Sequence, residues 1–408
     1  MSIRKKAGTL FVGRVIYSLS QWFLVIFLAN MADVESLDFY MLAVAITGPV
    51  IMLSQMNMRI YLVTDYDREY PVKDYLASRF VLSWLAFFFI LVFGFFYIDS
   101  ISGFQIILLV TVFKVVESLM DIYCGLFQRD STIKLVALSN IYRGATAVLS
   151  MFLMLYFFES VFLALIFTCI AWFIIFIGHK IYADRNIDLG NDTDKYKINF
   201  KLIKKCIPLG FVMMLVSLNF NIPVYMVSYL NENESVGIYS SIAYLLLIGK
   251  VISESFVQAS APKLSEYISD NNYQMLIQIS YKLFGLALLL GVCGLVFSLV
   301  FGELFLSIVY GEKFKLYNDV FIVIMLAALF SYVSQVYGMI LTAWRNIKDL
   351  FFIHTFQVVS VILVGIMTIP EMGITGAAWS LVSGFFVTMI LNFLLFKFKL
   401  KKAMSANI

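Results

Sequence analysis

Long apolar runs alternate with short polar connections along the whole chain. A helix needs about 20 mostly apolar residues to cross a membrane, and twelve runs meet that length. The pattern therefore predicts an all-α integral membrane protein with twelve transmembrane helices. The runs lie near residues 10–30, 37–57, 77–98, 104–126, 134–157, 160–182, 207–230, 236–258, 282–302, 318–342, 350–369 and 374–396.

The longest polar connection, residues 183–205, divides the runs into six and six. We expect an N-terminal six-helix bundle over 1–182, a cytoplasmic linker over 183–205 and a C-terminal six-helix bundle over 206–408. Six is even, so both halves enter the membrane from the same side. They are candidates for a parallel repeat related by an axis along the membrane normal. Pro71 and Pro262, each in a polar connector after the second run of its half, support this interpretation.

Lysine and arginine are distributed unequally between the two sides. With the N-terminus inside, inner segments hold 24 of the 30 basic residues, outer segments hold 2, and the other 4 lie within the runs. Cytoplasmic segments carry the excess of positive charge in membrane proteins. We therefore expect a multi-pass protein of the inner (plasma) membrane with both termini in the cytoplasm. An odd number of spans would destroy this asymmetry.

Composition supports the membrane class, and the absence of known motifs argues against catalytic and metal-binding functions. The chain has 408 residues, 62% hydrophobic and 14% charged, with 40 phenylalanines, which is more apolar than a soluble core requires. It has no phosphate-binding Gly-rich motif and no His/Glu metal pair, and its cysteines lack metal-ligand spacing. We expect no catalytic residue, no metal, no cofactor and no nucleic-acid partner. His179 and His354 are given no role.

Ionisable residues within the runs are the main functional signal. Lys114, Glu117 and Asp121 share one narrow helical face, and such residues rarely face lipid. We expect them to face other helices or a water-filled cavity. At 1.5 Å per residue, most of these groups fall in the inner half of the membrane. Seven residues form the set: Arg14, Lys114, Glu117, Asp121, Arg143, Lys250 and Glu254.

This lopsided distribution predicts an aqueous cleft open to the cytoplasm and sealed outside by apolar packing. Its cations, Arg14, Lys114, Arg143 and Lys250, are candidate substrate-binding residues because fixed positive charge attracts phosphate and other anions. The carboxylates of Glu117, Asp121 and Glu254 are candidates for ion coupling or for ion pairing. Purely structural pairing, of Lys250 with Glu254 for example, is the alternative. Arg14 lies near a helix end, where it could extend to the surface.

Helix breakers mark candidate hinges. Pro49 lies in the second run. Pro223 lies in the seventh run beside Asn219 and Asn221. Proline removes a helical hydrogen bond and bends the helix. Each position could act as a hinge or gate during transport, or it could be a static kink that improves packing.

Four short segments carry a family resemblance. They resemble, in order and spacing, the oligosaccharide-lipid flippases of the O-antigen type, within the multidrug/oligosaccharidyl-lipid/polysaccharide exporter superfamily. With the twelve runs, the resemblance covers essentially the whole chain. The segments are Ser235-Val-Gly-Ile-Tyr-Ser240, Ala261-Pro-Lys-Leu-Ser265, Val309-Tyr-Gly-Glu-Lys-Phe314 and Gly373-Ile-Thr-Gly-Ala-Ala-Trp379.

The resemblance implies two six-helix bundles that form a V-shaped transporter. It implies alternating access that moves undecaprenyl-pyrophosphate-linked oligosaccharide repeat units from the cytoplasmic to the outer leaflet, as in lipopolysaccharide and O-antigen synthesis. H⁺ or Na⁺ is a candidate counter-ion, with membrane lipid and other polysaccharide-assembly proteins as further partners. Relatives often carry an acidic residue in the seventh span. Asn219 and Asn221 stand there in this chain, which moves the expected coupling site to Glu117, Asp121 or Glu254.

Two alternatives remain. A multidrug or small-molecule exporter of the same fold would be expected to have an acidic or aromatic cavity, whereas cations here outnumber anions by four to three. An integral-membrane polysaccharide polymerase or ligase would be expected to have a large outer loop, and the outer connections here are short.

Overall fold

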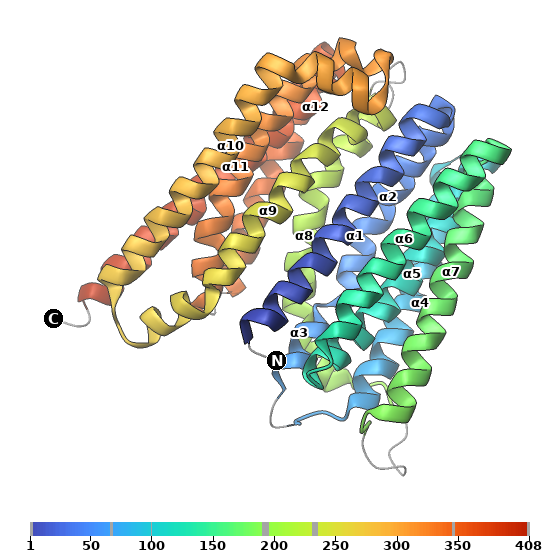
Figure 1. The fold of residues 1–408 in the computed structure, drawn as a ribbon. Helices are drawn as coiled ribbons and strands as arrows, with labels where there is room; N and C mark the ends of the chain where they lie inside the picture. Colours follow the sequence, from blue (N-terminus) through green and yellow to red (C-terminus); the bar gives the residue numbers. More distant parts are fainter. Residues whose placement is uncertain are drawn as a thin grey trace. The chain divides into compact units, whose positions relative to one another are not determined.

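A computed structural model describes residues 3–65, 68–98, 100–189, 196–230, 236–344 and 347–405 (Figure 1). Within these ranges the chain is helical and has no strand, which confirms the predicted fold class. The helices are α1 (Ile3–Met31), α2 (Val34–Gln55), α3 (Met58–Thr64), α4 (Val72–Tyr97), α5 (Ile101–Arg129), α6 (Ile133–Phe158), α7 (Val161–Asn186), α8 (Phe200–Leu230), α9 (Val236–Ser269), α10 (Tyr273–Tyr310), the short 3₁₀ helix η1 (Glu312–Tyr317), α11 (Asn318–Ala343) and α12 (Ile347–Ser405).

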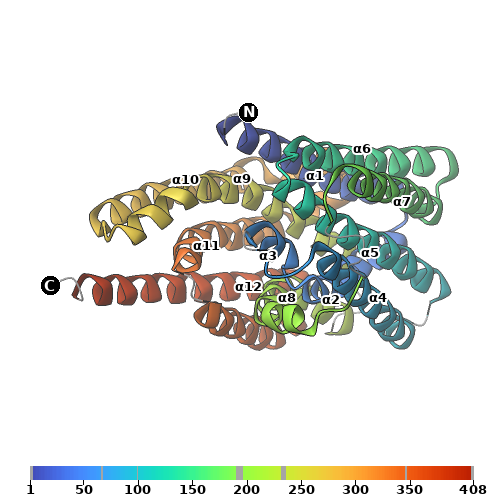
Figure 2. The same ribbon diagram turned by 90° about the horizontal axis from the view of Figure 1, so that it is seen from below.

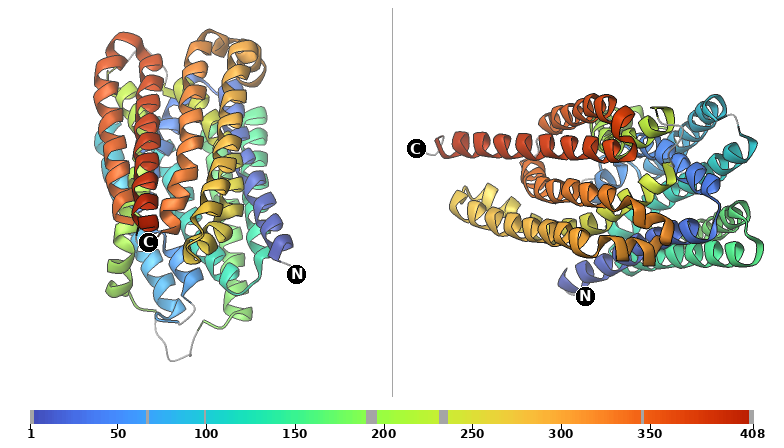
Figure 3. Two further views of the ribbon diagram at one scale, coloured as in Figure 1. Left: turned by 90° about the vertical axis from the view of Figure 1, so that its left-hand side faces the viewer. Right: turned by 90° about the horizontal axis from the view of Figure 1, so that it is seen from above.

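Ten of the described helical segments are long and apolar enough to cross a membrane. One of the ten, Lys348–Ser405, holds the last two predicted spans. It turns back at Gly373, whose φ of 57° lies in the left-handed region that favours glycine. The arms of α12 before and after this turn lie side by side (Figure 3, red and orange-red). The remaining predicted span is α5, which is not among the ten.

The described chain divides into two compact units, Met1–Ser217 and Leu218–Ile408. In the first unit α5 is the central helix, because it packs against α2, α3, α4, α6 and α7 (Figures 1 and 2). In the second unit α11 packs against α9, α10 and α12. The elements of the first unit therefore present their side chains to α5.

Helix α4 shows how this unit reverses the pattern of a soluble protein. Its outer face exposes aromatic side chains such as Phe88 and Phe96, which are 59% and 81% exposed. Its inner face buries Ser78, Arg79 and Ser83 completely. Apolar side chains outside and polar side chains inside are expected where the solvent is lipid and polar groups must find partners within the protein.

The first half of α8 belongs to the first unit. Asn199 caps α8 by accepting from the backbone N–H groups of Lys201 and Leu202, both at 3.1 Å. Its amide nitrogen also donates to Asp74 at 2.8 Å. Lys205 pairs with Glu69 at 2.5 Å, and this hydrogen bond lowers the pKa of the Glu69 carboxyl. The start of α8 is thereby held on the connector between α3 and α4.

Two expectations about the connections change. The predicted domains placed α8 wholly in the C-terminal bundle, whereas its contacts divide it after Ser217; residues 190–195 of the predicted linker lie outside the described ranges. The predicted polar connector over 261–279 is mostly helix, since α9 runs to Ser269 and α10 begins at Tyr273. Asn272 caps α10 by accepting from Met275 N–H at 3.2 Å. Hydropathy does not mark where such a helix ends, because the helix continues beyond its apolar run into polar sequence.

Helices α1 and α6 approach each other closely at glycines. A Cβ atom added at Gly13 would lie 2.8 Å from the Cα of Ala137. One added at Gly144 would lie 2.5 Å from Ser20 Oγ. Small residues allow such backbone contact between membrane helices. The two glycines therefore set the distance between α1 and α6.

We expect Gly13→Ala to lower the stability of the protein in detergent. The added methyl group meets backbone, which cannot rotate away, and overpacking of this kind costs about 1–3 kcal/mol. Gly8→Ala is the matched control, since nothing lies within 4 Å of its Cβ position. A lower apparent Tm for G13A than for G8A is expected. Equal values would show that α1 and α6 can separate freely.

Candidate functional site

The predicted polar face of α5 points into the first unit, where it forms ion pairs with basic side chains from several helices. Lys114, Glu117 and Asp121 are about one-fifth to one-quarter exposed. Their partners come from α1, α3, α4 and α6, and each of the two carboxylates lies between two cations. The structure thus supports the expectation that this face meets other helices rather than lipid.

Glu117 is the centre of the first cluster. One carboxylate oxygen lies 2.9 Å from Lys114 Nζ. The other lies 3.7 Å from a guanidinium nitrogen of Arg143 and accepts a hydrogen bond from the Tyr17 hydroxyl. Arg143 is 6% exposed and stacks on aromatic rings, with its guanidinium carbon 4.7 Å from the Tyr17 ring centre and 5.8 Å from that of Trp172. Ion pairing and cation–π contact therefore hold Arg143 in one place.

Asp121 is the centre of the second cluster, about one helical turn closer to the predicted cytoplasmic end of α5. Arg59 donates to one of its oxygens at 2.7 Å and to Gln128 at 3.2 Å. Arg79 lies 3.8 Å from the other oxygen. Arg59 sits on α3, which forms one candidate span together with α2. Asp121 thus bridges α3 and α4 through two guanidinium groups.

Arg79 is the least satisfied group in the described part of the chain. Its side chain is completely buried, yet Nε and both terminal nitrogens have no hydrogen-bond partner there. A buried guanidinium without partners is costly and presents its donors to an anion or to water. Around α5, four cations (Arg59, Arg79, Lys114 and Arg143) face two carboxylates. This surplus of positive charge can bind phosphate, for which the arginine fork is well shaped.

Arg59 and Arg79 were not predicted as site residues, because each stands near the end of an apolar run, where basic residues normally face the cytoplasm. A signal was present for Arg79: it stands four residues before Ser83, so both lie on one face of α4. Ser83 meets Ser118 of α5 at 3.1 Å. Polar residues at helical spacing on two spans could have indicated that these spans pack together. Arg59 had no such signal, since its span bends at the α2–α3 junction.

Other predicted residues lie elsewhere. Arg14 is exposed on α1. Lys250 and Glu254 are partly exposed on α9, and no ion pair within 4 Å joins them, so the structural pairing considered as an alternative is not formed. Pro49 is buried in α2. Lys250 and Glu254 belong to the second unit, and the ion pairs of the two clusters around α5 do not include them.

The second unit holds an uncharged polar cluster at Asn219. Its side-chain amide donates to Gln357 Oε1 at 2.9 Å, and His354 Nδ1 lies 2.9 Å from the same oxygen. Asn219 is 1% exposed and Gln357 is 3% exposed, while Asn221 at 9% and Pro223 are also buried. Pro223 has no N–H to offer the Asn219 carbonyl four residues earlier, so α8 lacks one helical hydrogen bond there.

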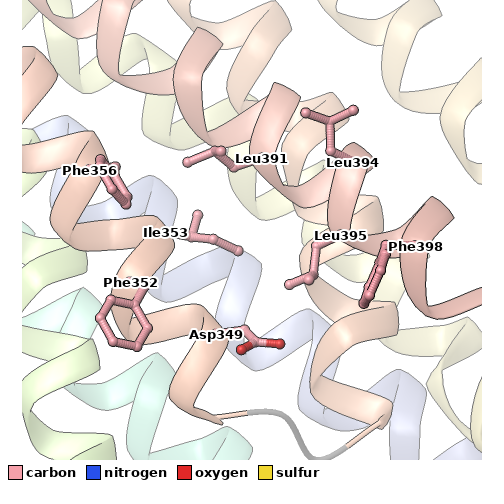
Figure 4. A pocket seen from close by; sticks show the side chains of 8 residues that line it. All are labelled: Asp349, Phe352, Ile353, Phe356, Leu391, Leu394, Leu395 and Phe398. Carbon is pink, nitrogen blue, oxygen red and sulfur yellow. The ribbon is translucent and has the colours of Figure 1, made fainter.

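A groove of about 350 Å³ between the two arms of α12 contains none of the predicted site residues (Figure 4). Its lining is aliphatic and aromatic apart from Asp349 at one end, which pairs with Lys399 at 3.4 Å. Such a surface fits lipid chains and offers no phosphate-binding group. The described residues contain no His/Cys/Asp/Glu cluster suited to a metal ion.

We expect Asp121→Asn to destabilise the first unit strongly. The variant leaves two largely buried guanidinium groups without a counter-charge, and breaking a buried ion pair from one side costs roughly 3 kcal/mol or more. Glu303→Gln is the control, because its pair with Lys315 is 3.9 Å long and more than half exposed. Thermal unfolding in detergent should show a lower apparent Tm for D121N alone. An unchanged Tm would show that Asp121 does not hold α3 and α4 together.

Comparison with known proteins supports the membrane-transport interpretation of this geometry. The chain is 24% identical over 398 residues to "Capsular polysaccharide biosynthesis protein CapF" of Staphylococcus aureus, covering 96% of this chain and 99% of that protein. Its fold is similar to that of the lipid II flippase MurJ in an inward closed conformation (TM-score 0.73, 13% identity, 95% of this chain and 87% of that chain). It is also similar to an outward-facing multidrug resistance MATE family transporter of the MOP superfamily (TM-score 0.69, 11% identity, 98% and 95%).

The family match covers most of the chain. Residues 3–268 match the family described as "Polysaccharide biosynthesis protein". This stretch contains the first unit from residue 3 onward and both clusters around α5. The chain is therefore a multi-pass membrane protein that belongs to the polysaccharide biosynthesis protein family.

Proposed function

We propose that the protein flips undecaprenyl-pyrophosphate-linked oligosaccharide repeat units from the cytoplasmic to the outer leaflet of the plasma membrane. The observation that carries this proposal is the surplus of cations around α5, where four basic side chains face two carboxylates inside a membrane bundle. A surplus of positive charge inside a membrane bundle is costly in free energy unless it has an anionic ligand to bind. A pyrophosphate carried on a lipid is a ligand that reaches the interior of a membrane protein.

The relatives support the same substrate class. CapF is described as a capsular polysaccharide biosynthesis protein and MurJ as a lipid II flippase. The outward-facing and inward-facing MATE transporters of the same fold support an alternating-access cycle.

In this mechanism the arginines hold the pyrophosphate and the carboxylates position the arginines. Arg79 offers donors that no described residue occupies, and Arg143 is fixed by its aromatic neighbours. Lys114 adds positive charge to the same cluster. Arg14 and, in the second unit, Lys250 are further proposed substrate-binding residues. The cycle draws on an ion gradient or the membrane potential, with both termini in the cytoplasm.

The buried helix breakers are proposed as the hinges of this cycle. Pro49 lies in α2, which packs against α5. Pro223 lies in α8 beside the buried Asn219 and Asn221. Each proline removes one helical hydrogen bond, so bending there breaks fewer interactions than elsewhere in the helix.

Export of small molecules is the second candidate, because the fold is shared with multidrug transporters. A cationic drug would meet like charge at Arg79 and Arg143, which costs free energy in a site of low dielectric constant. Transport of a cationic dye by the purified protein, with no movement of lipid-linked saccharide, would favour this candidate over the flippase.

We expect Arg143→Gln to lower flipping about tenfold or more, because one charge-assisted hydrogen bond contributes roughly 1.5–3 kcal/mol. The measurement is the movement of a lipid-linked oligosaccharide across proteoliposomes, together with surface polysaccharide in a deletion strain. Lys315→Gln, which removes one exposed charge from η1, should leave both unchanged.

A loss in R143Q could arise from the unpaired Glu117 rather than from a missing phosphate contact. The double variant Arg143→Gln/Glu117→Gln separates the two, since it removes both charges together. The proposal expects this variant to fold normally and remain inactive. Full activity of the double variant, at normal protein level, would contradict a phosphate-binding role for Arg143.

A further inference from the structure

The polar cluster of the second unit contains a histidine whose two ring nitrogens differ in chemistry. His354 Nδ1 and the Asn219 amide nitrogen both lie 2.9 Å from the same atom, Gln357 Oε1. The amide oxygen only accepts, so both neighbours must donate to it. Nδ1 of His354 therefore carries a hydrogen whether the ring is neutral or protonated. Nε2 is then the nitrogen at which the ring can gain or lose a proton.

The charges that face this ring come from one side only. Lys250 of α9 acts electrostatically on His354. Helix α8 contributes the uncharged Asn219, and on α12 the nearby Asp349 is paired with Lys399. No carboxylate lies within 4 Å of His354 among the described residues. A proton gained at Nε2 would therefore remain uncompensated and would repel Lys250.

The carboxylates around α5 are less suited to this role. Glu117 lies within 4 Å of Lys114 and Arg143, and Asp121 within 4 Å of Arg59 and Arg79. A proton bound by either carboxylate would leave two buried cations without a counter-charge. Both groups therefore act better as fixed anions than as proton carriers.

We propose that His354 is the proton-binding group of the transport cycle and that it takes up a proton at Nε2 while Nδ1 stays bound to Gln357. This inference deepens the proposed function, on which it rests, by naming H⁺ as the coupling ion. Binding of an anion at Lys250 would relieve the repulsion between Lys250 and the imidazolium. Occupancy of Lys250 and protonation of His354 are thereby linked.

The proton site can be tested without substrate, because the chain has two histidines. In His179→Gln protein labelled with ¹⁵N-histidine, His354 supplies the single imidazole signal of the native sequence. The expected spectrum shows the Nδ1–H tautomer at neutral pH and protonation of Nε2 as pH falls from about 8 to about 5. Lys250→Met should change this titration, because a charge that acts on the ring has been removed.

An Nε2–H tautomer, or a ring that stays neutral down to about pH 5, would overturn the inference. A titration that Lys250→Met leaves unchanged would overturn the proposed link to Lys250. These outcomes do not depend on whether the protein flips lipid-linked saccharide, so they separate failure of the proton site from failure of the proposed function.

Flux measurements test the role in transport. His354→Gln keeps a donor for Gln357 but cannot be protonated. In proteoliposomes we expect H354Q to bind lipid-linked oligosaccharide as before and to lose the acceleration of flipping by an imposed pH gradient. Glu303→Gln, which removes one exposed charge, is the control and should keep that acceleration. If Glu254→Gln loses the response while H354Q retains it, the assignment to His354 is wrong.

Discussion

The ion pairs on one face of α5 are the interaction on which the first unit depends. Glu117 and Asp121 each lie between two cations that come from different helices. In a membrane bundle, where apolar contact does little to choose one helix partner over another, such pairs decide which faces meet. They also explain why α4 buries serines and Arg79 while it exposes phenylalanines to the surroundings. The same carboxylates keep the arginines in fixed positions for a ligand.

The two units carry different chemistry. The first concentrates charge, with four cations around two carboxylates. The second concentrates neutral polar groups, with Asn219, His354 and Gln357 joined at one amide oxygen. The proposed flipping cycle has to bind an anionic substrate and to take up a proton, and these tasks need different electrostatic environments. The cationic clusters of the first unit suit the anion, and the neutral polar cluster of the second unit suits the proton. Helix α8 belongs to both units, since its start is held near Asp74 and its later part contains Asn219.

Sequence patterns predicted much of the fold because a membrane span is a strong hydropathy signal. The polar face of α5 followed from helical spacing. The structural pair between Lys250 and Glu254, considered as the alternative to a functional role, did not form, because spacing on one helix allows a contact but tertiary neighbours decide it. Arg59 and Arg79 were missed because a charge near a helix end resembles a surface residue in one dimension. His354 was missed because its partners, Asn219 and Gln357, are far apart in the chain.

The central claim is that the buried cations around α5 bind the pyrophosphate of a lipid carrier. The direct test is the affinity of the purified protein in nanodiscs for polyprenyl pyrophosphate and for the uncharged polyprenol, measured with wild type and Arg79→Met. We predict that wild type prefers the pyrophosphate, that this preference weakens at high salt, and that R79M loses most of it while remaining folded. Equal affinity of wild type for the charged and uncharged lipids would contradict the account.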